Sequence, residues 1–143
     1  LSKPFGGEIM KQEIGKALLV VFMEPDADVD GEFNEWYNRY HVPERVSVPG
    51  FLSARRFELC EGDGAIKYLA IYELEDEGVL HSEAYLKLRA ESTPMNFKPP
   101  KVQRLVYRQV FPEAGSFEDK PGSRSVTSGN ILLTLGRTLS LFG

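Results

Sequence analysis

The sequence contains few of the residues that usually carry metal, redox or disulfide chemistry. Its 143 residues include a single cysteine and two histidines. A lone cysteine can form neither an internal disulfide nor a cysteine-based zinc site. Cys60 also stands among acidic residues, so we do not expect it to act as a nucleophile. We therefore expect no disulfide and no metal site.

The sequence also lacks an excess of positive charge and a long apolar run. Its 17 Lys+Arg oppose 21 Asp+Glu. Because nucleic-acid binding depends on neutralising phosphates, we expect no nucleic-acid partner. The longest apolar run, residues 17–23, is far shorter than the roughly 20 residues that a membrane span needs. The first residues show no secretory signal pattern, so we expect no membrane association and a cytoplasmic protein.

The length and the apolar content of 42% suit one compact domain. The pattern divides the chain into an N-terminal arm (residues 1–15), a folded domain (residues 16–111) and a C-terminal segment (residues 112–143). The C-terminal segment begins as a linker rich in glycine, serine and proline, and it ends in apolar residues. An apolar tail must cover a surface, so we expect it to dock on the domain or on a partner subunit.

The first half of the domain reads as a buried strand followed by an aromatic helix. Residues 17–23 are continuously apolar and stop before Pro25, as in a central strand covered on both faces. Phe33, Trp36, Tyr37 and Tyr40 then follow the spacing of one helix face. Pro43 marks the point where this helix must bend or stop.

The second half predicts three further elements and with them the fold. Residues 51–60 and 65–74 read as a strand hairpin joined by the turn at 61–64. A second helix starts at residues 76–77, places Leu80, Ala84 and Leu88 on one face, and ends at 92–94, before a strand over 102–111. The order β-α-β-β-α-β predicts a ferredoxin-like α+β sandwich. Because both faces of residues 65–74 carry apolar side chains, we expect two sheets to meet in a homodimer.

The acidic segment at residues 26–31 has two interpretations. Its carboxylates and glycine match the first half of a calcium loop, but Tyr37 stands where such a loop needs a glutamate. We favour the other interpretation, in which these acids cap the first helix.

The aromatic helix also carries the strongest candidate for chemistry. Its rings surround His41, which with His81 is the only ready proton carrier between about pH 5 and 8. This arrangement is typical of an apolar pocket with one titratable group. The alternative is that the rings are core and His41 is an ordinary residue at a helix end. No motif surrounds His81, so we expect it at the surface.

Arg55 and Arg56 provide candidate cations. Adjacent strand residues face opposite sides of a sheet, so only one of them can reach a pocket on the helix side. A guanidinium there could hold a carboxylate, an enolate or a phenolate. The alternative is an ion pair with Glu58, Glu44 or another acid.

These motifs together resemble the EthD-like branch of the dimeric α+β barrel superfamily. The resemblance lies in F-N-E-W-Y (residues 33–37), Y-H-V-P-E-R (40–45) and P-G-F-L-S-A-R-R-F (49–57), and it covers residues 16–111. It implies a homodimer whose two sheets form a barrel and whose pockets lie against the helices. Relatives in the superfamily include lactone isomerases, cofactor-free monooxygenases, polyketide cyclases and haem enzymes.

From these observations we expect a small cofactor-independent isomerase, cyclase or oxygenase that acts on an aromatic, lactone or polyketide-like metabolite. His41 would transfer the proton, and Arg55 or Arg56 would stabilise the oxyanion. The predicted substrate-binding residues are Phe33, Trp36, Tyr37, Tyr40 and Glu44. Two alternatives remain open: a non-catalytic binding or accessory protein, and a haem protein with His41 or His81 as axial ligand.

Overall fold

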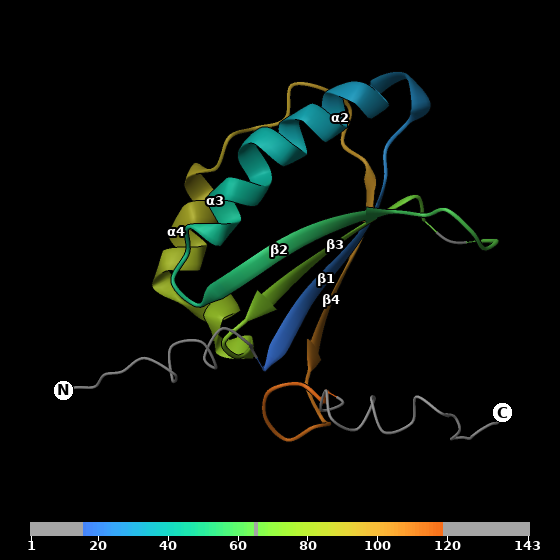
Figure 1. Ribbon diagram of the computed structural model, residues 1–143. Helices are drawn as coiled ribbons and strands as arrows, with labels where there is room; N and C mark the ends of the chain where they lie inside the picture. The colour runs from blue at the N-terminus through green and yellow to red at the C-terminus, as the bar shows by residue number, and fades with distance from the viewer. Residues whose placement is uncertain (1–15, 65, 119–143) are drawn as a thin grey trace, which may run out of the picture.

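The computed structural model describes residues 16–64 and 66–118 and shows an antiparallel sheet with helices on one face (Figure 1). The four strands lie in the order β2-β3-β1-β4. They are β1 (Ala17–Glu24), β2 (Phe51–Glu58), β3 (Tyr68–Leu74) and β4 (Lys101–Arg108). The predicted α+β sandwich is confirmed. The predicted arm and residues 119–143 of the predicted tail lie outside the described residues.

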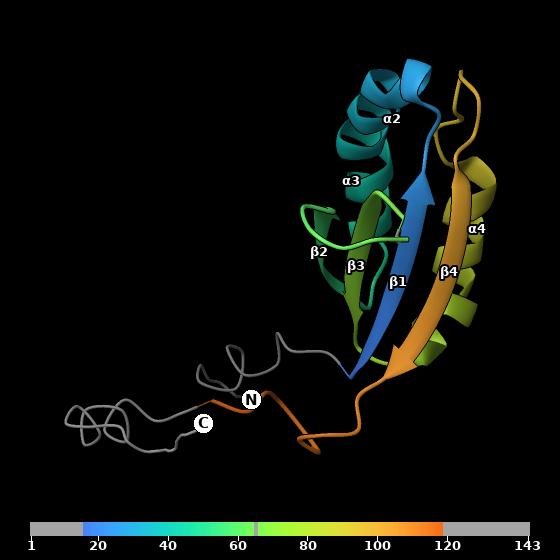
Figure 2. The same ribbon diagram turned by 90° about the vertical axis from the view of Figure 1, so that its right-hand side faces the viewer.

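Strand β1 is central, as its continuous apolar run predicts. It pairs with β3 on one side and β4 on the other. Leu19 and Met23 point toward the helices and are almost fully buried. Leu18 and Phe22 point to the opposite face, which we call the outer face, and are only partly buried. Figure 2 looks onto this outer face, with the helices behind the strands.

The first helical segment is longer than predicted because it passes through Pro43. It consists of η1 (Ala27–Val29), α2 (Asp30–Trp36), the π-helical η2 (Tyr37–His41) and α3 (Val42–Val46). In η2 the Val42 N–H donates to the Tyr37 carbonyl, five residues back. Pro43 lies in the first turn of α3. The wider π turn thus accommodates a residue that has no N–H to donate.

The π turn also corrects the predicted aromatic face. A regular helix would bring Tyr40 into line with Phe33 and Tyr37. The wider turn instead brings His41 beneath Tyr37, with the two ring centroids 4.5 Å apart. Tyr40 is 40% exposed and is not among the residues that line the cavity described below.

The acids of residues 26–31 tether the first helical segment to other parts of the domain. Asp26 pairs with Lys98 at 2.7 Å, and Asp30 accepts hydrogen bonds from the Tyr68 hydroxyl at 2.8 Å and from Lys67 at 3.2 Å. The Tyr68 hydrogen bond lowers the pKa of Asp30. Neither η1 nor α2 has a side-chain cap, so the predicted capping role is wrong. The described residues contain no cluster of three metal-ligating His, Cys, Asp or Glu side chains.

The second helical segment is divided in two at Ser82. It consists of the 3-10 helix η3 (Glu77–His81) and α4 (Glu83–Glu91). Ser82 is extended and caps α4 by accepting a hydrogen bond from the Tyr85 N–H. This break shifts the helix phase, so Tyr85 is buried where a single helix would bury Ala84. None of the helices among the described residues is long and apolar enough to cross a membrane.

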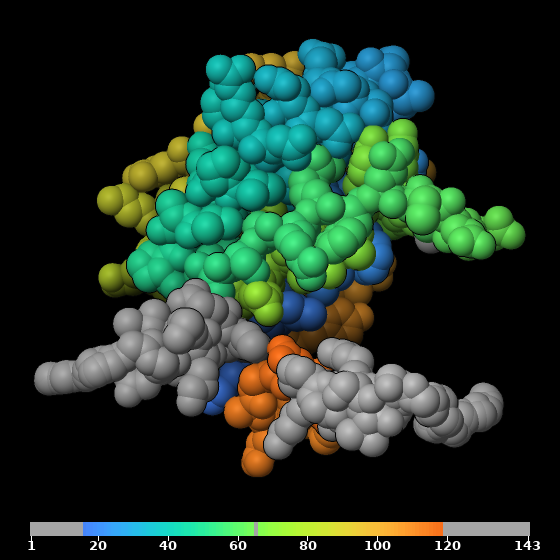
Figure 3. Space-filling model, viewed as in Figure 1, coloured from blue at the N-terminus to red at the C-terminus, as the bar shows by residue number. Residues whose placement is uncertain are grey.

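In β3 of the β2–β3 hairpin, side chains alternate between the two faces of the sheet as predicted. Tyr68, Ala70 and Tyr72 point toward the helices, while Leu69 and Ile71 lie on the outer face and are only partly buried. Residues 59–64 project from the body of the molecule as a finger (Figure 3). The core lies between the helices and the sheet, and its most buried large side chains are Met23, Phe33, Tyr72 and Leu74.

Candidate active site

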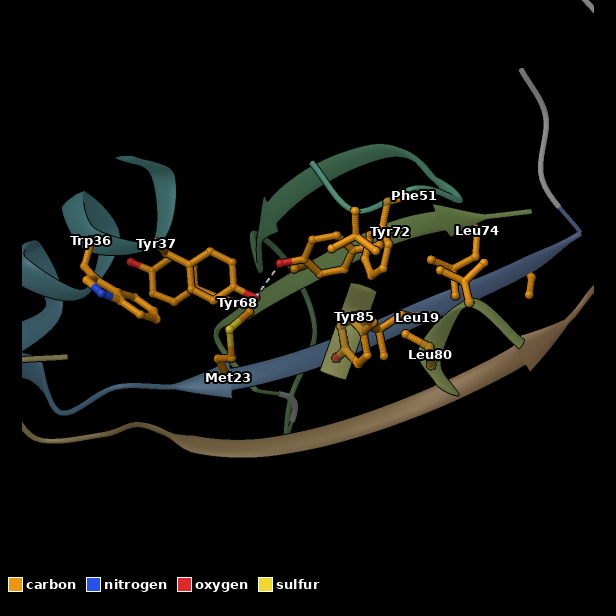
Figure 4. Close-up of a cluster of buried hydrophobic side chains, with 14 of the residues drawn as sticks. Leu19, Met23, Trp36, Tyr37, Phe51, Tyr68, Tyr72, Leu74, Leu80 and Tyr85 are labelled. Carbon is orange, nitrogen blue, oxygen red and sulfur yellow. Dashed lines mark hydrogen bonds between the residues drawn. The ribbon is translucent and has the colours of Figure 1, made fainter. Parts of the chain in front are cut away.

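A cavity lies between the helices and the sheet, beside the buried aromatic residues shown in Figure 4. Its volume is about 170 Å³. Ligand pockets usually measure about 300–1,000 Å³, so this cavity suits a ligand of one or two rings. The residues that line it are Leu19, Val21, Met23, Phe33, Trp36, Tyr37, His41, Arg45, Tyr72, Tyr85, Arg89, Met95, Pro100, Val102 and Arg104.

Four of the predicted site residues line this cavity together. Phe33 and Trp36 come from α2, and Tyr37 and His41 come from the π turn. Trp36 and Tyr37 pack edge to face with ring centroids 5.9 Å apart. The alternative reading of these rings as core is also correct in part, because Phe33 is fully buried. The same aromatic face therefore builds the core and one wall of the cavity.

Two tyrosine hydroxyls meet in the cavity wall. The hydroxyls of Tyr37 and Tyr72 are hydrogen bonded at 3.0 Å (Figure 4). Burial raises the pKa of both phenols, so both stay protonated at neutral pH. One hydroxyl donates to the other, which leaves the second hydrogen free to donate to a ligand. The pair is therefore a candidate donor to a substrate oxygen.

His41 lies between two aromatic rings on the same wall. Its ring centroid is 4.9 Å from that of Trp36 and 4.5 Å from that of Tyr37. Burial, followed by the positive charges of Arg45 and Arg56, lowers the pKa of His41 to about 3. Its Nδ1 is buried and has no hydrogen-bond partner among the described residues. At neutral pH His41 is therefore an uncharged imidazole that can accept a proton.

Three arginines that line the cavity lie around Tyr85. The guanidinium carbons of Arg45 and Arg89 each lie 5.9 Å from the centroid of the Tyr85 ring. Arg104 donates a hydrogen bond to the Tyr85 hydroxyl at 3.2 Å. Nη1 of Arg45 is buried without a partner among the described residues. We call Arg45, Arg89 and Arg104 the arginine cluster.

The predicted cations Arg55 and Arg56 do not line the cavity. Arg55 lies on the outer face, with its guanidinium carbon 5.3 Å from the Phe57 ring. Arg56 lies on the helix side, where it stacks 4.5 Å from the Tyr37 ring and donates to Asn38 Oδ1 at 2.7 Å. Arg56 thus packs behind Tyr37, and an oxyanion role would fall to other cations.

Glu44 also lies away from the cavity. Its carboxylate accepts hydrogen bonds from the backbone N–H and the hydroxyl of Thr93. These bonds tie α3 to the segment that follows α4. Both carboxylate oxygens therefore have partners, and the predicted contact between Glu44 and substrate has no support in this geometry.

The sequence reasoning missed two tyrosines and three arginines of the cavity: Arg45, Tyr72, Tyr85, Arg89 and Arg104. Two of them carried a usable signal. Tyr72 falls on the helix-facing side of an alternating strand, and Arg45 belongs to the H-V-P-E-R motif. Arg89 and Arg104 carried none, because an isolated arginine on a helix or an edge strand is usually a solvated surface residue.

Comparisons with known proteins identify the fold. No family profile matches the sequence, and neither does any curated protein. A proposed monooxygenase from Shewanella loihica matches with a TM-score of 0.54 and 16% identity, over 67% of this chain and 95% of that chain. The haem degrader MhuD from Mycobacterium tuberculosis, solved with two haems in its active site, matches with a TM-score of 0.50 and 18% identity, over 69% of this chain and 99% of that chain.

These matches show that the chain has the ferredoxin-like α+β fold that the sequence predicted. The similar structures also include an EthD family protein from Bacillus halodurans, with a TM-score of 0.47 and 10% identity, over 66% of this chain and 97% of that chain. The antiparallel sheet with helices on one face agrees with the fold that the predicted EthD-like resemblance implies. The fold alone does not select a reaction.

The residues present do not fit a haem. His81 is exposed on η3 and does not line the cavity. His41 is packed between two aromatic rings, and a cavity of about 170 Å³ is small for a porphyrin. We therefore derive no chemical step through haem for this chain.

Proposed function

We propose that the protein is a small enzyme that removes a proton from the carbon next to the carbonyl of an aromatic ketone or lactone. The observation that carries this proposal is the uncharged His41, which has an unpartnered Nδ1 and lines the same cavity as the Tyr37–Tyr72 hydroxyl pair. A base and a hydrogen-bond donor in one apolar cavity are the two groups that enolate formation requires.

Each group has a distinct role in the proposed reaction. His41 accepts the proton from the substrate carbon, and the free hydroxyl hydrogen of the tyrosine pair is donated to the oxygen that becomes the enolate. The positive charge of Arg45 stabilises the negative charge that develops there. Trp36 and Phe33 pack against the substrate ring.

We further propose that the enolate reacts with dioxygen. In that reaction a substrate CH₂ group and one O₂ give a hydroperoxide, which loses water to leave a carbonyl group. We choose this outcome over isomerisation or cyclisation by analogy with the proposed monooxygenase of the same fold, and dioxygen uptake decides between them.

The test follows deuterium exchange into 2-tetralone and isochroman-3-one, a ketone and a lactone of two rings in which a CH₂ group separates the carbonyl from a fused benzene ring. In deuterated buffer, NMR should show protein-dependent loss of the signal of the acidic CH₂, and an oxygen electrode should show dioxygen uptake. Exchange without uptake would favour an isomerase or cyclase. If the protein accelerated exchange into neither compound over buffer alone, proton abstraction would be refuted.

A second candidate is a non-catalytic binding or accessory protein. The observation that favours it is the low pKa of His41, about 3, because a base is most effective when its pKa lies near the working pH. A binding protein would take up the same aromatic compounds in the same cavity and leave their C–H bonds intact.

We also propose that the chain works as a homodimer through the outer face of its sheet. Leu18, Phe22, Leu69, Ile71 and Leu105 are apolar outer-face residues that are only partly buried, and no described helix or strand covers them. Apolar surface of this kind is stabilised when two sheets pack face to face.

Native mass spectrometry tests this assembly. We expect the wild-type protein at twice the mass of one chain and the Phe22→Glu variant as a monomer, because the dimer would bury the introduced charge. Lys87→Glu places a charge change on the exposed side of α4 and should leave the dimer intact. A wild-type monomer would contradict the proposed assembly.

A further inference from the structure

The arginine cluster brings three positive charges together around a single tyrosine. Arg45 comes from α3, Arg89 from α4 and Arg104 from β4, and all three contact Tyr85, which is only 2% exposed. Like charges placed this close repel one another unless negative charge compensates them. Some group must therefore supply negative charge to the arginine cluster.

The described part of the protein does not supply it. None of the residues that line the cavity is acidic. The ion pairs found among residues 16–64 and 66–118 use other cations, namely Arg39, Lys67, Lys98 and Arg108. Glu44, which follows Pro43 on α3, is occupied by Thr93. The unpartnered Nη1 of Arg45 is a buried donor that an external acceptor could satisfy.

We propose that the cavity binds an aromatic carboxylate, with the ring against the apolar wall and the carboxylate on the arginine cluster. This inference rests on the proposed function, because it names the substrate class of the same cavity. A carboxylate is a small planar oxyanion that guanidinium groups bind through paired hydrogen bonds, which suits a cavity of this size.

The burial of the lining residues gives the ligand a direction. Trp36, Tyr37 and Tyr72 are buried and form the inner end of the cavity. Arg89, Val102 and Arg104 are exposed, so the cavity opens between α4 and β4. The aromatic ring of the ligand therefore enters first. The carboxylate stays near the mouth of the cavity with Arg89 and Arg104, and it reaches inward no further than Arg45.

A bound carboxylate would also change His41. Burial is the main cause of its low pKa, and the charge of Arg45 is the next. An anion on the arginine cluster offsets the second cause and raises the pKa of His41. The carboxylate would thereby make His41 a stronger base when substrate is present, which an uncharged ligand would not do.

The test compares cinnamate with cinnamamide, two compounds of the same shape that differ in charge. Trp36 is the only tryptophan of the chain and lines the cavity, so its fluorescence reports binding. Fluorescence and calorimetric titrations should show that cinnamate binds about 10-fold more tightly or better, in line with a charge-assisted hydrogen bond.

The variants assign that preference to the cluster. Arg89→Gln and Arg104→Gln should each reduce the affinity for cinnamate severalfold and the affinity for cinnamamide by less, so that the preference for cinnamate falls. Both positions are exposed, which limits any effect on folding. Arg39→Gln is the matched control, since Arg39 is an exposed arginine that pairs with Glu35 outside the cavity. Loss of the preference in the control as well would mean nonspecific attraction and would overturn the inference.

The two proposals fail in different ways. Equal affinity for cinnamate and cinnamamide would overturn the carboxylate inference and leave proton abstraction from an uncharged substrate standing. Binding of neither compound would overturn the inference too. The exchange measured with 2-tetralone and isochroman-3-one needs no negative charge on the ligand, so it decides the proposed function separately.

Discussion

Replacing His41 by alanine is expected to slow deuterium exchange into 2-tetralone by about 10²–10⁴-fold, the range that positioned general bases contribute. The chain contains two histidines, His41 and His81, and only His41 lines the cavity. The rate would be followed by NMR in deuterated buffer. The loss should appear in kcat, because proton transfer occurs in the transition state.

Two further variants separate chemistry from packing. His41→Phe keeps a ring between Trp36 and Tyr37 but removes the base, so it should be as slow as His41→Ala while its thermal unfolding stays near that of the wild type. His81→Ala changes an exposed histidine and should exchange at the wild-type rate. A His41→Phe variant with full activity would show that His41 is not the base.

The pH dependence of exchange should follow the pKa of His41 in the free protein. The active form of the base is the uncharged imidazole, and a pKa of about 3 keeps His41 in this form at all higher pH values. For an uncharged substrate, kcat/KM should therefore stay flat between about pH 5 and 8 and fall only toward about pH 3. A midpoint near 6.5, the ordinary value for histidine, would contradict the burial of this ring.

Replacing Gly50 by alanine is expected to lower the free energy of unfolding by about 2–4 kcal/mol. Gly50 has a φ of +98°, a region that L side chains rarely adopt. An added Cβ would also lie 2.5 Å from Cγ2 of Val79, which is buried on η3. Strain and overpacking act together, because Val79 is held in the core. Urea denaturation of the two proteins gives the difference.

Gly31→Ala provides the matched control for Gly50→Ala. Gly31 lies within α2, has an ordinary negative φ, and has no atom within 4 Å of the position of an added Cβ. Alanine there should stabilise the protein by up to about 1 kcal/mol, because glycine is a poor helix former. Equal unfolding free energies for Gly50→Ala and the wild type would mean that the turn before β2 tolerates a side chain.

Much of the fold could be predicted because its signals are local. The continuous apolar run of residues 17–23 indicates the central strand, and the alternation along residues 66–73 indicates which side chains face the helices. Both patterns arise from the two-residue period of a strand, which a few neighbouring residues are enough to reveal. The hairpin and the order of elements follow from the turn residues between them.

The helices were predicted less well because local irregularities change which of their side chains are buried. The π turn at η2 moves Tyr40 to the surface and His41 inward, and the cap at Ser82 exchanges Ala84 for Tyr85 in the core. The π turn and the break at Ser82 each shift the buried face of the helix by one residue. A search for a period of 3.6 residues assumes an uninterrupted helix, so it cannot detect such a shift.

The sequence by itself determined the sheet, its central strand and the wall of the site that consists of Trp36, Tyr37 and His41. These residues are neighbours in one helical segment, so their proximity needs no knowledge of the rest of the chain. Only the tertiary structure decided the rest of the site. Arg45, Arg89 and Arg104 meet at Tyr85 because α3, α4 and β4 pack there, and no local pattern records contacts between segments so far apart in the sequence.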